Sequence, residues 1–169
     1  MKTDYQRVEG MLYSHYRRKK RVSSLKSRLI RTQLRIDRLR NDIKECNIEL
    51  SDTLKAIDYS REYVYTGDTT SNIERELERA VDNILGKIER EIREKKRIKS
   101  RVRNLEKAID DVEVLLEELS EEELQIIELR YGENIRSYRR MESLIPMGKS
   151  TIERKHKEVM KYLIDRLDE

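Results

Sequence analysis

The segment Ser120-Glu121-Glu122-Glu123-Leu124 opens the last fifty residues of the chain and predicts the start of a helix. The Ser120 hydroxyl can accept a free amide of the first turn, and the Glu123 carboxylate can reach back to the Ser120 amide, which is the capping-box pattern. Gly132 is expected to end this helix, since glycine is common just past a helix terminus. The apolar residues between them fall on one face at helical spacing: Leu124, Ile127 and Tyr131.

Two further helices are expected behind this one. Ser137 can cap the first, and Pro146 ends it because proline lacks an amide hydrogen and clashes with the preceding turn. Its apolar stripe consists of Met141, Leu144 and Ile145. The pattern restarts at Gly148 as a long amphipathic helix with basic residues along it. The apolar face of that helix carries Ile152, His156, Val159, Met160 and Leu163. Two helices joined by a short turn, the second of them basic, predict a helix-turn-helix.

Three features of this segment are similar to region 4 of bacterial sigma factors: the run LSEEELQIIELRY at 119–131, the Ser-capped helix that ends in Met141, and STIER at 150–154. They cover about 50 of the 169 residues. Gly148 stands where that family usually has a capping Ser or Thr. The whole chain, with its helical N-terminal part, resembles phage late-gene activators of the ArpU/RinA type.

The resemblance implies a recognition helix that docks in the major groove of promoter DNA, at or near the upstream (minus thirty-five) element. It would place the N-terminal helices where RNA polymerase could be contacted. Carried over residue by residue, the base-contacting positions fall on Lys149, Ser150, Glu153 and Arg154. Arginine can pair bidentately with guanine and glutamate can accept from cytosine, so these residue types suit base reading.

Residues 136–161 hold eight Lys or Arg against three acids, and we expect no acidic segment opposite them. Clustered cations can neutralise DNA phosphates, and the first turn of such a helix can enter the major groove. The predicted phosphate contacts are Arg136, Arg139, Arg140, Thr151, Lys155 and Lys157. The alternative is an amphipathic helix whose basic face is simply solvated.

The preceding residues carry two long heptad patterns of apolar positions. The first consists of Val8, Met11, Val22, Leu25, Leu29, Thr32, Ile36, Leu39, Ile43, Cys46, Leu50, Thr53 and Ile57. The second consists of Leu77, Val81, Ile84, Ile88, Glu91, Lys95, Ile98, Val102, Leu105, Ile109, Val112, Leu116 and Leu119. We expect the two stripes to fold back on each other as an antiparallel hairpin with a turn at about 59–71, because each stripe alone would stay in water. The hairpin would occupy 1–119 and the helix-turn-helix 120–169.

Charge favours this pairing. Residues 17–44 hold twelve Lys or Arg against two acids, whereas residues 106–123 hold nine acids against one Lys. The basic run 17–21 is therefore interpreted as forming ion pairs across the hairpin, with a nucleic-acid patch as the alternative. Facing residues should have numbers that sum to about 131. The expected pairs are Leu25 with Leu105, Leu29 with Val102, Ile43 with Ile88, and Leu50 with Val81.

Composition points to long helices rather than one large core: 43% of residues are charged, one is proline, and Phe and Trp are missing. The single cysteine, Cys46, excludes an intramolecular disulfide and a multi-cysteine zinc site. No apolar stretch approaches 18 residues, so we expect neither export nor a membrane partner, and a cytoplasmic location. His15 and His156 are isolated and should be packed in apolar surroundings. Nothing resembles a phosphate loop, a metal-ligand pair or a nucleophile with its base, so no enzyme, metal or cofactor is expected.

The sequence thus predicts an all-α protein, a long antiparallel coiled-coil helical hairpin followed by a C-terminal helix-turn-helix. Two functions stay open. One is a sequence-specific regulator of transcription that binds double-stranded DNA and, by the resemblance, is encoded by a phage or prophage. The other is a coiled-coil scaffold, or a phage packaging or assembly factor, that binds DNA without sequence choice or binds a protein. The heptads would also allow homo-oligomers.

Overall fold

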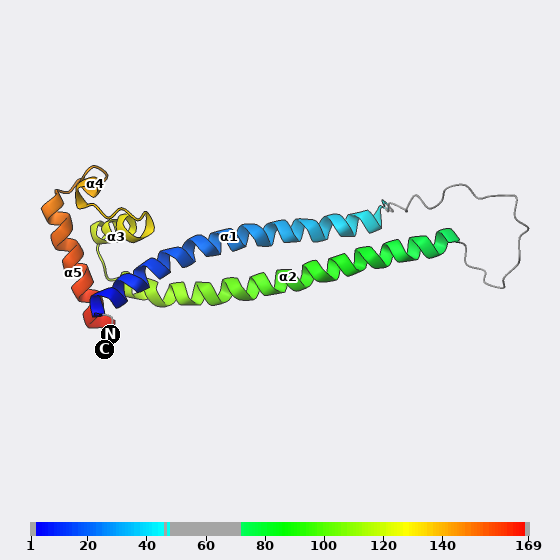
Figure 1. Cartoon of the computed structure of the whole chain (residues 1–169), viewed down its shortest axis with the longest axis horizontal. Coiled ribbons are helices and arrows are strands. Elements are labelled where there is room, and N and C mark those ends of the chain that lie inside the picture. The colour runs from blue at the N-terminus through cyan, green and yellow to red at the C-terminus, as the bar shows by residue number, and fades with distance from the viewer. Residues whose placement is uncertain (1–2, 46, 48–71, 168–169) are drawn as a thin grey trace, which may run out of the picture. The chain divides into compact units, whose positions relative to one another are not determined.

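The regular structure is helical throughout the described residues. The computed structural model describes residues 3–45, 47 and 72–167, and within these ranges it contains no strand. This confirms the predicted all-α class. The elements are α1 (Asp4–Lys44), α2 (Asn72–Leu116), α3 (Glu121–Ile127), the π-helical turn η2 (Glu128–Gly132), α4 (Tyr138–Glu142) and α5 (Lys149–Leu167) (Figure 1). Cys46, the predicted turn at 59–71 and the first pattern's Leu50, Thr53 and Ile57 lie outside the described residues.

The chain forms two compact units. The terminal unit consists of Met1–Lys26 and Ser100–Glu169, and the middle unit of Ser27–Lys99. In each unit, part of α1 packs against part of α2. All described positions of the first heptad pattern are buried or half-buried, as predicted. The same holds for the second pattern except at Leu77, which is 42% exposed.

Contacts between α1 and α2 show that the two helices run antiparallel in each unit. In the terminal unit, Lys19 pairs with Glu113 (2.6 Å) and Lys26 with Glu106 (2.7 Å), and both pairs of residue numbers sum to 132. The basic stretch of α1 therefore lies beside acids of α2, as charge predicted. Each of these exposed pairs contributes at most about 1 kcal/mol to stability. The individual seam pairs remain predictions, and Leu50 lies outside the described residues.

The terminal unit has one core to which both ends of the chain contribute. Val8 and Leu12 of α1 are buried with Val112 and Leu116 of α2 and with residues that follow position 120. The latter are Ile127, Tyr131, Val159, Met160 and Leu163. The Tyr13 ring also meets the Tyr131 ring edge to face, with centroids 4.9 Å apart. The first turns of α1 thus share a core with the C-terminal helices.

The α3–η2 segment ends at Gly132, as predicted, but Gly132 is the last residue of η2 rather than the residue that follows the helix. The Glu133 amide donates to the Glu128 carbonyl (2.9 Å). The left-handed residue is Asn134, with φ 59°. A Cβ at position 132 would lie 3.0 Å from a ring carbon of Tyr16, so glycine lets this ring approach without a shift. α1 also stabilises this terminus, because the Lys20 ammonium donates to the Gly132 carbonyl at 2.6 Å.

Of the other features predicted for the C-terminal helices, two agree with the structure and one does not. The Ser120 amide and hydroxyl both donate to the Glu123 carboxylate (2.9 and 2.7 Å), which confirms the expected reach of Glu123. Ser137 is the N-cap residue of α4. Leu144 was expected on the apolar stripe but is 55% exposed, because α4 ends at Glu142 and the chain then leaves the helical path before Ile145, which is buried. This part of the prediction was wrong.

Candidate nucleic-acid interface

α5 has one buried and one exposed face. The predicted apolar residues Ile152, His156, Val159, Met160 and Leu163 are all buried. The four apolar ones pack in two clusters: Val159, Met160 and Leu163 share one with α1 and α2, and Ile152 forms the other with Ile126, Met141 and Ile145. The rotation of α5 about its axis is therefore set by packing on α3, α4 and α1.

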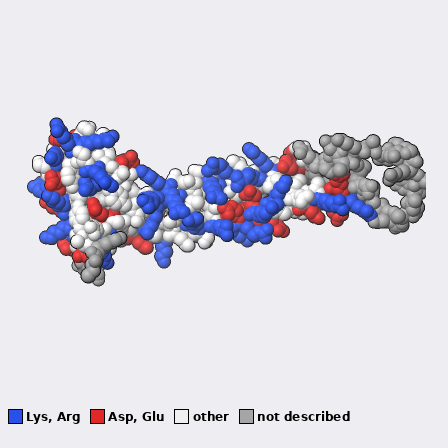
Figure 2. Space-filling model, in the orientation of Figure 1, with Lys and Arg blue, Asp and Glu red and all other residues white. Residues whose placement is uncertain are grey.

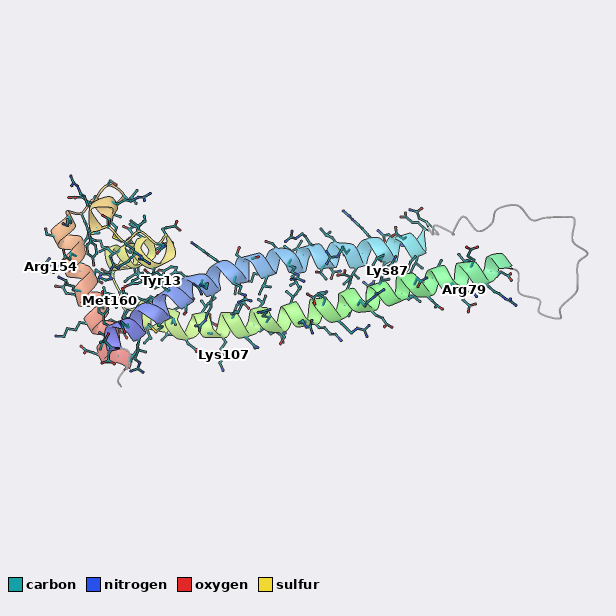
Figure 3. All side chains as sticks on the ribbon, viewed as in Figure 1. Tyr13, Arg79, Lys87, Lys107, Arg154 and Met160 are labelled. Carbon is teal, nitrogen blue, oxygen red and sulfur yellow. The ribbon has the colours of Figure 1, made fainter. Side chains whose placement is uncertain are left out.

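The exposed face carries the residues predicted to contact bases. Lys149, Ser150 and Arg154 are exposed, and Glu153 is half-buried. In Figure 3 the Arg154 side chain lies on the outer side of α5. Met160 of α5 lies on the inner side, where α5 faces α1 and its residue Tyr13. Three of the four predicted residues, Lys149, Ser150 and Arg154, are thus exposed in the first two turns of α5.

Acids on the same helix surround this group. Arg154 lies 3.9 Å from Glu158, and Lys157 donates to Glu153 at 2.9 Å. The hydrogen bond from Lys157 lowers the pKa of Glu153 below its ordinary value. Both pairs join residues four apart on one helix and are accessible to solvent, so each contributes little to stability. An incoming phosphate or base edge can therefore replace the acids at little cost.

The N-terminus of α5 is capped by a side chain from α4. The Gly148 carbonyl accepts from the amides of Thr151 and Ile152 (3.0 and 3.1 Å), so Gly148 is the N-cap residue but offers no side chain. The Glu142 carboxylate accepts from the Lys149 amide instead, at 3.3 Å. A carboxylate at this end also interacts favourably with the helix dipole. Glu142 therefore ties the start of α5 to the end of α4.

The residues predicted to contact phosphates divide into two groups. Arg136, Arg139 and Arg140 are exposed on α4 and on the segment before it. Thr151, by contrast, is half-buried, and Lys155 forms an ion pair with Glu122 of α3 that leaves 23% of its side chain exposed. Figure 2 shows Lys and Arg side chains over α3, α4 and α5, with Asp and Glu side chains among them.

The expectation that no acidic segment lies opposite α5 was wrong. Glu122 of α3 contacts Lys155, and Glu118 accepts from Arg166 (2.7 Å) and from the Tyr162 hydroxyl (2.5 Å). The hydrogen bonds from Tyr162 and Arg166 lower the pKa of Glu118. These acids contact the later turns of α5, so the first turn keeps its basic character.

A buried polar network, which sequence analysis did not predict, joins the buried face of α5 to η2 and α4. The ring nitrogens of His156 lie within hydrogen-bond distance of two tyrosine hydroxyls, Nε2 at 3.0 Å from Tyr131 and Nδ1 at 3.1 Å from Tyr138. Burial, with the positive charges of Arg130 and Lys157, lowers the pKa of His156 to about 4. The imidazole is therefore neutral near pH 7, so one nitrogen donates and the other accepts.

Arg130 extends this network to α1. Its guanidinium lies 5.0 Å from the centre of the Tyr138 ring, donates to the Arg136 carbonyl (3.2 Å), and lies 4.0 Å from a carboxylate oxygen of Glu9. The only signal in the sequence was a histidine on the apolar face of the last helix. The partners on α1, η2 and α4 could not be assigned without the fold.

His15 is the second buried histidine. It is completely buried, as predicted, and neither ring nitrogen has a hydrogen-bond partner in the structure. Burial and the nearby charge of Lys19 lower its pKa. His15 is therefore a packing residue whose surroundings favour the uncharged imidazole.

Within the part of the chain that the structure describes, no three His, Cys, Asp or Glu side chains are grouped so that they could hold a metal ion. The helices described there also include none with the length and apolar character needed to cross a membrane. Comparisons with protein-family models, with curated proteins and with solved structures found no match.

Proposed function

We propose that the protein is a sequence-specific regulator of transcription that binds double-stranded DNA through α5. The observation that carries the proposal is the exposure of Lys149, Ser150 and Arg154 in the first two turns of a helix that is otherwise held in the core by one buried face. A recognition helix needs this arrangement, since its leading side chains reach base edges while the rest of the domain fixes its rotation.

α4, the turn after it and α5 take the roles of a helix-turn-helix in this proposal. Arg139 and Arg140 on α4, together with Arg136, would hold phosphates beside the groove that α5 enters. Lys155 is a packing residue for α3 in this arrangement, since its charge is already paired with Glu122.

The similarity of residues 119–154 to sigma region 4 extends the proposal. A region-4-like domain would bind promoter DNA near the upstream element, and the long helices α1 and α2 would offer a surface to RNA polymerase. A phage or prophage activator is the setting that this resemblance implies.

A second function is favoured by the length of the paired helices. α1 and α2 together account for 86 residues, far more than a recognition domain needs. A structural scaffold, or a packaging or assembly factor with non-specific DNA or protein binding, would use such a length directly.

A binding selection against random duplexes separates the two functions. A regulator enriches a defined motif, whereas a scaffold gives a flat profile. With the enriched duplex in hand, Arg154→Ala or Lys149→Ala should weaken binding by about 1–3 kcal/mol, roughly 5- to 150-fold, while helicity stays unchanged. The control is Arg79→Ala, which removes one exposed cation from α2 and should change affinity little. Equal affinity of wild type and Arg154→Ala for the selected duplex would exclude α5 as the reading helix.

Phosphate contacts have a different signature. Arg139→Ala should weaken all duplexes alike and lower the slope of log affinity against log salt by about one. An unchanged slope would show that Arg139 does not contact DNA.

A further inference from the structure

The contact between α1 and α2 in the middle unit has two flanks that differ in charge. On one flank, Arg28 donates to Glu94 (2.8 Å), and Arg35 makes two hydrogen bonds to Glu91 (3.1 and 3.0 Å). On this flank, Arg28 and Arg35 of α1 are thus paired with acids of α2.

The other flank is a groove of about 320 Å³ whose charged lining consists of cations alone. With 3.6 residues per turn, Lys96 and Lys99 lie about 160° and about 140° around the α2 axis from Glu94. Arg40 of α1 and Lys95 of α2 complete the charged lining. Cations from both helices therefore face one another across the groove, an arrangement that repels unless an anion lies between them.

Lys95 is a half-buried cation whose hydrogen-bond partner carries no charge. It occupies a position of the heptad seam and is half-buried, yet its ammonium donates to the neutral amide oxygen of Gln33 (2.5 Å). The Gln33 amide donates in turn to Asp37 (2.8 and 3.0 Å), which lies 4.0 Å from Arg40. Among the described residues no carboxylate pairs directly with Lys95. A half-buried charge without a counterion costs free energy, which an anion in the groove would offset.

We propose that this groove, formed by Arg40, Lys95, Lys96 and Lys99, binds the phosphate backbone of double-stranded DNA without reading its sequence. The proposal rests on the proposed function, to which it adds a second DNA contact outside α5. The lysines from 95 to 99 span about 6 Å along α2, and duplex DNA carries one phosphate per about 1.7 Å of its axis, so each ammonium can meet a phosphate.

Composition favours duplex DNA over other anionic partners. Single-stranded nucleic acid is held by stacking its bases on aromatic side chains, and protein interfaces are enriched in aromatic residues. The side chains that line the groove include no aromatic ring. What the groove offers is charge and amide groups, which suit a phosphate backbone.

The test uses the full chain and a fluorescein-labelled duplex of random sequence, with affinity measured by anisotropy over a series of salt concentrations. The groove variant carries Lys95→Gln, Lys96→Gln and Lys99→Gln. At about 0.9 per phosphate contact, its salt slope should be about 2–3 smaller than that of wild type.

A matched control carries Arg90→Gln, Arg93→Gln and Arg97→Gln, which removes the same charge from another face of the same helix. Its slope should change by less than one. Equal losses in both triple variants would show that net charge alone matters, and no loss in the groove variant would show that the groove is not used. Either result overturns the proposal.

Circular dichroism checks that the variants fold. If the groove triple does not, Lys96→Gln/Lys99→Gln against Arg93→Gln/Arg97→Gln repeats the comparison at exposed positions, with an expected slope difference of about 1.8. Labelled polyglutamate that binds wild type but not the groove variant, with duplex binding unaffected, would assign the groove to an acidic polypeptide and overturn the proposal.

Arg139→Ala in the same salt series separates the two proposals. A smaller slope for Arg139→Ala with no effect of the groove variant leaves the proposed function standing and removes the groove. If wild type binds no duplex at all, both proposals fall.

Discussion

Leu12→Ala tests whether the first turns of α1 and the C-terminal helices form one cooperative core. Leu12 is completely buried in the cluster that contains Ile127, Val159 and Leu163. Loss of three carbon atoms costs about 2.4 kcal/mol at about 0.8 kcal/mol each. A partly collapsed cavity of roughly 40 Å³ adds about 1 kcal/mol at ~24 cal/mol per Å³. We expect the free energy of unfolding to fall by about 3–4 kcal/mol in urea titrations followed by circular dichroism.

The control for this variant is Val114→Ala, which shortens a 62% exposed side chain of α2 in the same unit and should change stability by at most about 0.5 kcal/mol. Hydrogen exchange gives the second readout. In Leu12→Ala, the amides of α5 should lose protection together with those of residues 4–26 of α1. If α5 keeps its protection while α1 loses it, the shared core is not cooperative and the reasoning fails.

Two further predictions concern titration and register. The unfolded-state pKa of a histidine is about 6.5 and that of His156 in the fold is about 4, so the unfolded state binds more protons between these values. Stability should therefore fall as pH drops from about 6.5 towards 4, by on the order of 3 kcal/mol, and His156→Gln should lose this part of the pH dependence in urea titrations across that range. A pH dependence identical to wild type would contradict the assignment. Cysteines at Leu25 and Leu105, with Cys46→Ser, should close within one chain on mild oxidation, because facing seam positions bring their β-carbons near bonding range; exclusively intermolecular cross-links in dilute protein would show that the predicted register is wrong.

Much of the fold could be predicted because its signals are local or periodic. The capping of α3 depends on Ser120 and Glu123, which are three residues apart, and the packing of α1 on α2 follows from heptads and charge. The buried face of α5 also follows from spacing alone.

The errors arose where a distant residue decides the local structure. At position 132 the sequence indicated only a helix end, whereas in the fold the ring of Tyr16, more than a hundred residues away in the chain, lies 3.0 Å from where a Cβ would stand. Lys155 reads as one of several cations on a basic helix, but Glu122 is near enough to pair with it. The exposure of Leu144 follows from the short length of α4, which periodicity does not determine.

The core shared by α1 and α5 has a consequence for how the chain folds during its synthesis. Leu12 and Leu163 are roughly 150 residues apart, so at about 5–20 residues per second the ribosome needs roughly 8–30 s to deliver the second after the first. Throughout this time Val8 and Leu12 lack the partners that α5 supplies. Nascent chains, and chains truncated before α5, therefore present apolar surface to chaperones and proteases, so that only a chain that includes α5 completes this core.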